Sequence, residues 1–115
     1  VLAPGGARPF TPKALRGSMG SLLRLPVYEV SDLGRAVAAL ADAGFSQCVA
    51  ATRGGAPLDE AVFRERTVVW MSGETGEAPP ELSVCDPITI PMRGEVESLN
   101  VTVAGALMLF AARQR

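Results

Sequence analysis

The sequence predicts an α/β fold in which a parallel sheet is flanked by helices. Short apolar runs of strand length alternate along the chain with segments that carry helix caps and helix periodicity. Two of these runs, Phe45 to Ala51 and Thr67 to Met71, are apolar almost throughout, as expected for strands covered on both faces. With 115 residues, of which 48% are hydrophobic, the chain is large enough for one small domain with a core.

Caps and periodicity place the helices. Thr11 precedes a proline that suits the first helical position. Ser31 and Ser98 are the expected caps of two further helices, and Gly44 suits the end of the first of these. The predicted helices cover residues 12–19, 31–44, 80–84 and 98–113, with a helical turn at 57–63.

Strands are predicted at residues 27–30, 45–51, 67–71 and 88–90. In a parallel α/β sheet, ligands bind at the loops that follow the carboxyl ends of the strands. Three loops meet this condition, at residues 52–56, 72–78 and 91–97. The sequence therefore predicts a binding site formed by these three loops.

Charge and composition exclude several classes of protein. The formal net charge is −1, so bulk attraction to nucleic acid is not implied. Ten arginines stand against one lysine; arginine binds phosphate through two parallel hydrogen bonds, but a GC-rich genome explains the same bias. Because the chain has no histidine, Ser-His and Cys-His catalysis are excluded.

The two cysteines, Cys48 and Cys85, lie far apart in apolar surroundings. They are predicted to be buried, reduced thiols of a cytoplasmic protein. Two cysteines without histidine are too few for a structural zinc site, so no metal is expected. No stretch is long and apolar enough to span a membrane, and no signal peptide is present, so no membrane partner is expected.

The last predicted helix is apolar on nearly every side. One stripe contains Leu99, Val103, Ala106, Leu107 and Phe110, and other faces carry Val101, Ala104, Gly105 and Met108. A helix of this kind is buried on more than one side. We therefore expect one side to meet a second subunit, with Gly105 and the alanines permitting close approach of the helices.

Three segments carry a family resemblance. Residues 10–27, FTPKALRGSMGSLLRLPV, keep a Pro-Lys-x-x-Arg-x-Ser-Met-Gly pattern, and residues 68–82, VVWMSGETGEAPPEL, form a weaker match. Residues 90–110, IPMRGEVESLNVTVAGALMLF, follow an Ile-Pro-Met-x-Gly-x-x-Glu-Ser-Leu-Asn-Val pattern almost position for position. With these motifs the chain resembles the SpoU (TrmH-like) family of SPOUT RNA methyltransferases over essentially its whole length.

This resemblance implies a deep trefoil knot, in which the C-terminal helix passes through a loop. It implies that residues 1–115 are the C-terminal part of a SpoU-type domain whose N-terminal part is missing, with the knot and cofactor site within about 45–115. The implied activity is methyl transfer from S-adenosylmethionine to a ribose 2′-hydroxyl of ribosomal or transfer RNA. The implied enzyme is a homodimer that binds RNA and needs no metal.

The resemblance also assigns roles to residues. The cofactor-binding positions are Ala51, Thr52, Ser72, Gly73, Ile90, Met92, Ser98 and Leu99. Glu74, Ser98 and Asn100 match the polar residues that hold the ribose or the catalytic group. Arg16, Ser18 and Arg24 are candidate RNA contacts. Simpler interpretations are a solvated carboxylate for Glu74, helix caps for Ser98 and Asn100, a solvated helix face for the arginines, and a core position for Trp70.

Two departures from the family pattern leave alternatives open. In Ser72 to Gly76 the glycines are shifted, so the Ser72 side chain either crowds the cofactor or bonds to it. The family's first motif, with an Asn and an Arg that activate the ribose hydroxyl, is absent, so this chain is expected to be inactive alone. One alternative is a catalytically incomplete knotted module for RNA binding or dimerisation. Another is a flavodoxin-like nucleotide-binding domain, although the chain lacks the glycine-rich phosphate loop.

Overall fold

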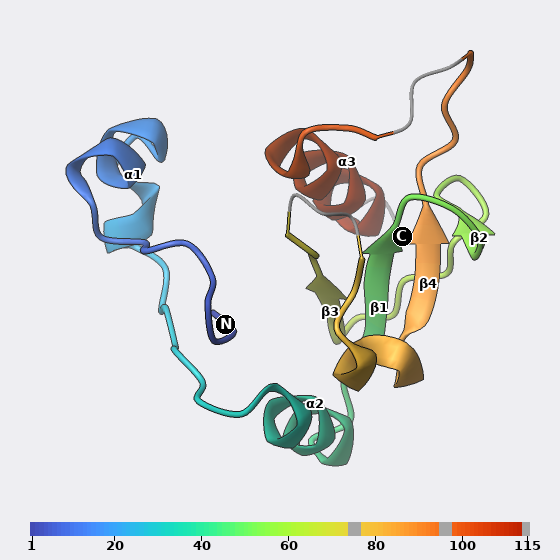
Figure 1. Cartoon of the computed structure of the whole chain (residues 1–115), viewed down its shortest axis with the longest axis horizontal. Helices are drawn as coiled ribbons and strands as arrows, with labels where there is room; N and C mark the ends of the chain where they lie inside the picture. The colour runs from blue at the N-terminus through green and yellow to red at the C-terminus, as the bar shows by residue number, and fades with distance from the viewer. Residues whose placement is uncertain (74–76, 95–97, 114–115) are drawn as a thin grey trace. The chain divides into compact units, whose positions relative to one another are not determined.

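The computed structural model of the chain describes residues 1–73, 77–94 and 98–113. The chain divides into two compact units, an N-terminal unit of residues 1–36 and a C-terminal unit of residues 37–115, and each is described by itself (Figure 1). Across the described ranges, no helix has the length and apolar character needed to cross a membrane.

The N-terminal unit contains α1 (Pro12–Gly17) and the short 3-10 helix η1 (Ser21–Leu23). Thr11 caps α1 as predicted, because its hydroxyl oxygen accepts the N–H of Ala14 at 3.2 Å. The predicted helix over residues 12–19 ends two residues early, since the chain turns at Met19 and Gly20, both of which have positive φ.

The predicted strand at residues 27–30 is wrong. Glu29 forms one isolated parallel bridge with Leu2, in which the N–H of Leu2 donates to the carbonyl of Tyr28 at 2.7 Å. The pairing does not extend, because Pro4 has no N–H to donate and the chain turns there. One bridged pair, Leu2 with Glu29, is too few to make this segment a strand.

The helix α2 (Leu33–Asp42) links the two units in sequence. The predicted cap Ser31 is wrong by one residue: Oδ1 of Asp32 accepts the N–H of Arg35 at 2.9 Å. A carboxylate in this position satisfies one of the unpaired N–H groups at the start of a helix and also favours the helix dipole.

The end of α2 is a Schellman motif centred on Gly44, as the sequence predicted. Gly44 has a φ of +81°, and its N–H donates to the carbonyl of Ala41 at 2.9 Å. The N–H of Phe45 donates to the carbonyl of Leu40 at 3.0 Å. Glycine adopts this left-handed conformation without steric cost, so the helix ends cleanly.

Four parallel strands form the sheet of the C-terminal unit, in the order β2-β4-β1-β3 (Figure 1). The strands are β1 (Ser46–Ala51), β2 (Ala56–Pro57), β3 (Thr67–Trp70) and β4 (Asp86–Thr89). The parallel α/β sheet flanked by helices is therefore confirmed.

Two elements around β4 differ from the prediction. β4 begins at Asp86 instead of Ile88. The strand tolerates Pro87 because β2 pairs only with Ile88 and Thr89. The missing N–H of Pro87 therefore costs no hydrogen bond to β2. The helical turn predicted at residues 57–63 is shorter than expected. Pro57 belongs to β2, and residues 58–60 form a turn in which the N–H of Glu60 donates to the carbonyl of Pro57 at 3.0 Å.

The last helix, α3 (Val101–Arg113), packs its buried face on the sheet. Met108 is completely buried and belongs to a core cluster with Cys48, Ala61, Phe63 and Ile88. Burial of the side chains in this cluster fixes α3 against one face of the sheet. The short 3-10 helix η2 (Pro80–Val84) was predicted as a short helix, and its Leu82 is buried as well.

Side chains of the opposite sheet face form a second buried group. Val37, Val49 and Trp70 are buried. The side chain of Gln47 donates to the carbonyl of Val37 at 2.8 Å and accepts the indole N–H of Trp70 at 2.9 Å. The prediction that Trp70 is a core residue is confirmed, and its polar atom is satisfied.

The outer face of α3 leaves large apolar side chains exposed. Val103, Leu107 and Phe110 recur at i, i+4 and i+7 and are 47%, 41% and 60% exposed. We call these three residues the α3 stripe. Gly105, expected to allow approach of another subunit, faces the sheet instead, where a Cβ would lie 3.8 Å from the methyl carbon of Met71.

Candidate cofactor-binding site

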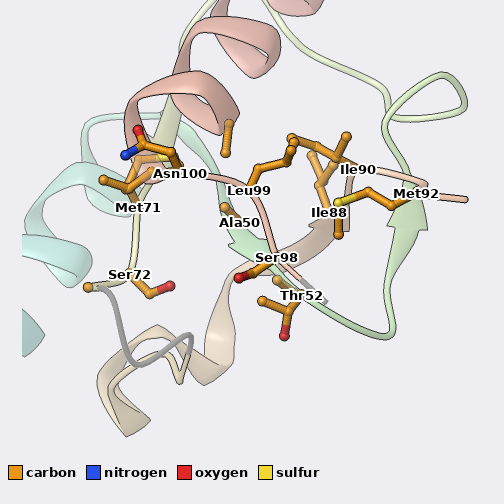
Figure 2. A pocket seen from close by; sticks show the side chains of 14 residues that line it. Ala50, Thr52, Met71, Ser72, Ile88, Ile90, Met92, Ser98, Leu99 and Asn100 are labelled. Carbon is orange, nitrogen blue, oxygen red and sulfur yellow. The ribbon is translucent and has the colours of Figure 1, made fainter. Parts of the chain in front are cut away.

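A cavity of about 320 Å³ lies where the strands of the C-terminal unit end (Figure 2). Its walls come from the ends of β1, β3 and β4, from the loops that follow them and from the start of α3. The lining residues are Ala50, Ala51, Thr52, Met71, Ser72, Gly73, Ile88, Ile90, Met92, Ser98, Leu99, Asn100, Val101 and Ala104.

The parallel register brings three loops to one edge of the sheet. Ala51 of β1 pairs with Thr89 of β4, and Val49 of β1 pairs with Trp70 of β3. The strands therefore end at similar levels, and the loops that follow them open on the same side. The cavity lies at the edge where the sequence predicted a binding site.

The cavity has an apolar part and a polar part. Apolar side chains gather on one side in Figure 2, and they are Ile88, Ile90, Met92 and Leu99. Hydroxyl groups lie lower in the same view, on Thr52, Ser72 and Ser98. A lining of this kind suits a small ligand with a flat apolar group and several hydrogen-bonding groups.

The structure brings together the residues predicted from the family resemblance. All eight predicted cofactor-binding residues line the cavity, and they are Ala51, Thr52, Ser72, Gly73, Ile90, Met92, Ser98 and Leu99. Two of the three predicted catalytic residues, Ser98 and Asn100, line it as well, whereas Glu74 lies outside the described residues. Their roles toward a ligand stay predictions.

Asn100 is the cap of α3. Its Oδ1 accepts the N–H of Thr102 at 2.9 Å, and its main-chain carbonyl accepts the N–H of Ala104 at 2.9 Å. The predicted cap at Ser98 is therefore wrong, because α3 starts at Val101 and a cap directly precedes the first helical residue. Since capping uses the side-chain oxygen of Asn100, its NH2 group is the part that can donate to a ligand.

The predicted RNA contacts lie in the N-terminal unit. Ser18 organises the turn after α1: its hydroxyl donates to the carbonyl of Leu15 at 3.0 Å and accepts the N–H of Leu22 at 3.5 Å. Arg16 and Arg24 are exposed. Ser18 is thus a structural residue of this turn, and contact of any of the three with RNA remains a prediction.

Sequence analysis did not assign five lining residues to the site: Ala50, Met71, Ile88, Val101 and Ala104. All five are apolar and occupy regular strand or helix patterns, which carry no local sign of a ligand site. Their place in the sequence could have indicated the site, because Met71 directly precedes Ser72 and Ala104 lies one helical turn after Asn100.

The two thiols do not belong to this cavity. Cys48 and Cys85 are free and buried, as predicted. Burial, with smaller contributions from Cys85 and Asp86, raises the pKa of Cys48 to about 11. Burial and then Asp86 raise the pKa of Cys85 as well. Both thiols are protonated at neutral pH and are poor nucleophiles.

A sequence profile of the SpoU rRNA methylase family matches residues 1–110. The chain belongs to this family. Among curated members, an uncharacterised tRNA/rRNA methyltransferase of Mycolicibacterium smegmatis is 41% identical over 110 residues, covering 91% of this chain and 34% of that protein. One from Synechocystis is 32% identical over 109 residues, covering 93% of this chain and 40% of that protein. The chain thus spans well under half the length of these relatives.

Solved structures of SpoU proteins share the fold. A TrmH-family protein of Porphyromonas gingivalis has a TM-score of 0.83 and 32% identity, covering 99% of this chain and 47% of that chain. AviRb of Streptomyces viridochromogenes, solved in complex with AdoMet, has a TM-score of 0.82 and 29% identity, covering 99% of this chain and 48% of that chain. The resemblance that the three motifs indicated is therefore confirmed.

Proposed function

We propose that the chain binds S-adenosylmethionine in the cavity and that the protein transfers its methyl group to a ribose 2′-hydroxyl of ribosomal or transfer RNA. One observation carries the proposal: loops from three strands and the start of α3 converge on a single cavity. Membership in the SpoU family supports it, as does the likeness to AviRb, whose structure holds AdoMet.

The lining fits the proposed cofactor. Adenine is flat and largely apolar, and Ile90, Met92 and Leu99 offer it an apolar wall. The hydroxyls of Thr52 and Ser72 can hydrogen-bond the polar parts of the cofactor. When bound, S-adenosylmethionine supplies an electrophilic methyl group.

The proposed role of the polar residues is to hold the substrate ribose. Ser98 offers a hydroxyl and Asn100 offers its NH2 group in the cavity lining. Fixing the 2′-hydroxyl in place gains rate by proximity. Because the chain has no histidine and its thiols are protonated, we propose that Ser98 and Asn100 orient the 2′-hydroxyl. Glu74 is the third polar group that we propose for this task.

We further propose that α3 passes through a loop to form a deep trefoil knot, with knot and cofactor site within residues 45–115. The likeness to the Porphyromonas and Streptomyces structures supports a shared chain path. On this proposal, residues 1–115 act as the C-terminal part of a SpoU-type methyltransferase domain. The knot would hold the start of α3 at the cavity.

We propose that the protein is a homodimer joined through the α3 stripe. The segment from Val101 to Ala112 contains no charged residue, so the stripe is apolar over its full length. A symmetric dimer places the same patch of both subunits in contact, which removes this surface from water without burying a charge.

Replacing Leu107 by glutamate is expected to weaken the dimer about 100-fold or more, because a carboxylate would be buried in an apolar contact. Val62→Glu is the matched control, since Val62 is 84% exposed and lies outside the α3 stripe. Analytical ultracentrifugation over a range of concentrations measures both. If Leu107→Glu sediments like the wild type, the dimer does not use this stripe.

Calorimetric titration with S-adenosylmethionine tests the cofactor proposal directly. We expect one binding event per chain. A folded protein that shows no binding would contradict the proposal and would leave the alternative of a catalytically incomplete module for RNA binding or dimerisation.

A pair of substitutions at Ser72 tests its hydroxyl in the same titration. If the hydroxyl bonds to the cofactor, Ser72→Ala and Ser72→Gly both weaken binding about fivefold. Ser83→Ala is the control, because Ser83 lies exposed on η2 outside the cavity lining. Tighter binding by Ser72→Gly would show instead that the Ser72 side chain crowds the cofactor.

A further inference from the structure

Met19 occupies a backbone position that favours glycine. α1 ends in a Schellman motif, in which the N–H of Gly20 donates to the carbonyl of Leu15 at 3.3 Å and the N–H of Met19 donates to that of Arg16 at 3.1 Å. Met19 has a φ of +52°, and within the described part of the chain no other non-glycine residue has a positive φ. A side chain is strained there, because its Cβ approaches the following carbonyl oxygen.

The end of α2 provides an internal comparison. Gly44 occupies the same position of the same motif, with a φ of +81° and the corresponding pair of hydrogen bonds. A Cβ at Gly44 would meet nothing within 4 Å, so lack of space does not explain the glycine. The two helix ends differ in that α1 retains a large side chain at the strained position. Strain retained at one residue points to a function for its side chain.

Within the N-terminal unit, the side chain of Met19 is not buried. It is 90% exposed, the largest value among the large hydrophobic residues that the structure describes. The turn around it is held by main-chain hydrogen bonds and by the hydroxyl of Ser18, which bonds to Leu15 and Leu22. The fold therefore presents an apolar side chain on a fixed turn.

The charge around Met19 identifies the kind of partner. Residues 1–28 contain four cations and no Asp or Glu, and the cations are Arg8, Lys13, Arg16 and Arg24. All four are exposed. Over the whole N-terminal unit, residues 1–36, five basic residues stand against two acidic ones, whereas the C-terminal unit has ten acidic residues against six basic ones. A polyanion is therefore drawn to the N-terminal unit.

We propose that Met19 packs against an unstacked base of the substrate RNA while Arg16 and Arg24 bind neighbouring phosphates. RNA alternates flat apolar bases with anionic phosphates, which matches an exposed apolar side chain between cations. This inference rests on the proposed function, which supplies RNA as the substrate, and it assigns RNA binding to a defined turn. Because methionine is flexible and polarizable, the contact gives affinity without selecting one base.

Fluorescence anisotropy with a labelled single-stranded oligouridylate, at several salt concentrations, separates the two kinds of contact. Met19→Asn, which tolerates the left-handed conformation, is expected to weaken binding about tenfold with an unchanged salt dependence. Arg16→Gln is expected to reduce the slope of log K against log salt by about 0.7, as expected for one phosphate contact. Val62→Asn, the control at another exposed apolar residue, is expected to change neither.

Thermal unfolding of the same variants excludes a structural role. Met19→Asn and Met19→Gly are expected to melt at or above the wild-type temperature, because the strained side chain is removed. A fall of more than about 4 °C, or wild-type RNA affinity in Met19→Asn, would overturn the inference. Titration with S-adenosylmethionine keeps the two proposals apart. Met19→Asn is expected to keep the wild-type affinity for the cofactor while it loses RNA affinity. A wild-type protein that binds the cofactor but not RNA would reject the Met19 contact and leave the cofactor site standing.

Discussion

Replacing Gly55 by alanine is expected to reduce the free energy of unfolding by about 3 to 4 kcal/mol, which combines overpacking with a disfavoured left-handed residue. A Cβ at Gly55 would lie 2.3 Å from the carbonyl oxygen of Pro87 and 2.7 Å from its carbonyl carbon. Both are backbone atoms of β4, so no side-chain rotation relieves the contact. Gly55 also has a φ of +96°, which adds backbone strain to the clash.

Gly54→Ala is the matched control for this prediction. Gly54 has a φ of +70°, but a Cβ there would meet nothing within 4 Å. Its expected cost is therefore only the left-handed conformation, about 1 kcal/mol. Urea denaturation of both variants measures the difference. Equal costs would show that Gly55 does not lie against β4 as described.

The same substitution tests the link between this loop and the cavity. Gly55 directly precedes β2, and its neighbour Ala56 pairs with Ile88, which lines the cavity. The hydroxyl of Thr89 also donates to the carbonyl of Gly54. Displacement of the loop should therefore disturb the wall formed by Ile88. We expect Gly55→Ala to weaken binding of S-adenosylmethionine even where the protein remains folded.

Truncation of Met108 to alanine is expected to cost about 3 kcal/mol of unfolding free energy. Met108 is fully buried among Cys48, Phe63 and Ile88, so its removal leaves a cavity in the core. Leu109→Ala is the control one residue along α3, where the side chain is 64% exposed, and should cost well under about 1 kcal/mol.

Urea denaturation distinguishes these two variants, and titration with S-adenosylmethionine adds a functional measurement. Because Asn100, the cap of α3, lines the cavity, loosening the attachment of α3 at Met108 should lower cofactor affinity. Leu109→Ala should leave that affinity unchanged. If Leu109→Ala were as unstable as Met108→Ala, the assignment of Met108 to the sheet-facing side of α3 would be wrong.

Local signals predicted much of the secondary structure. Thr11 and Gly44 were correctly placed as a helix cap and a helix end, because their preferences arise from hydrogen bonds and backbone conformation within a few residues. The apolar runs that became β1 and β3 were predicted because strands covered on both faces are apolar nearly throughout.

Local signals failed where several residues compete for one role. Ser31 and Asp32 both suit a helix cap, as do Ser98 and Asn100, and only the hydrogen bonds of the fold select Asp32 and Asn100. Likewise, residues 27–30 resemble a strand, but a strand needs a partner, and among the residues that the structure describes only Leu2 pairs with this segment. Which residue caps a helix, and whether a strand finds a partner, therefore depend on the three-dimensional arrangement of the chain and not on residue preference alone.

The sequence by itself determined the family, the parallel sheet and the loops at which the cavity forms, because the motifs and the alternation of strands with helices are visible along the chain. Only the tertiary structure decided that Met108 faces the core while Leu107 faces outward, since a helix apolar on nearly every side has no periodic signal to orient it. It also decided that Met19 stands exposed at a strained helix end, because exposure depends on how the residues of the N-terminal unit pack around that turn.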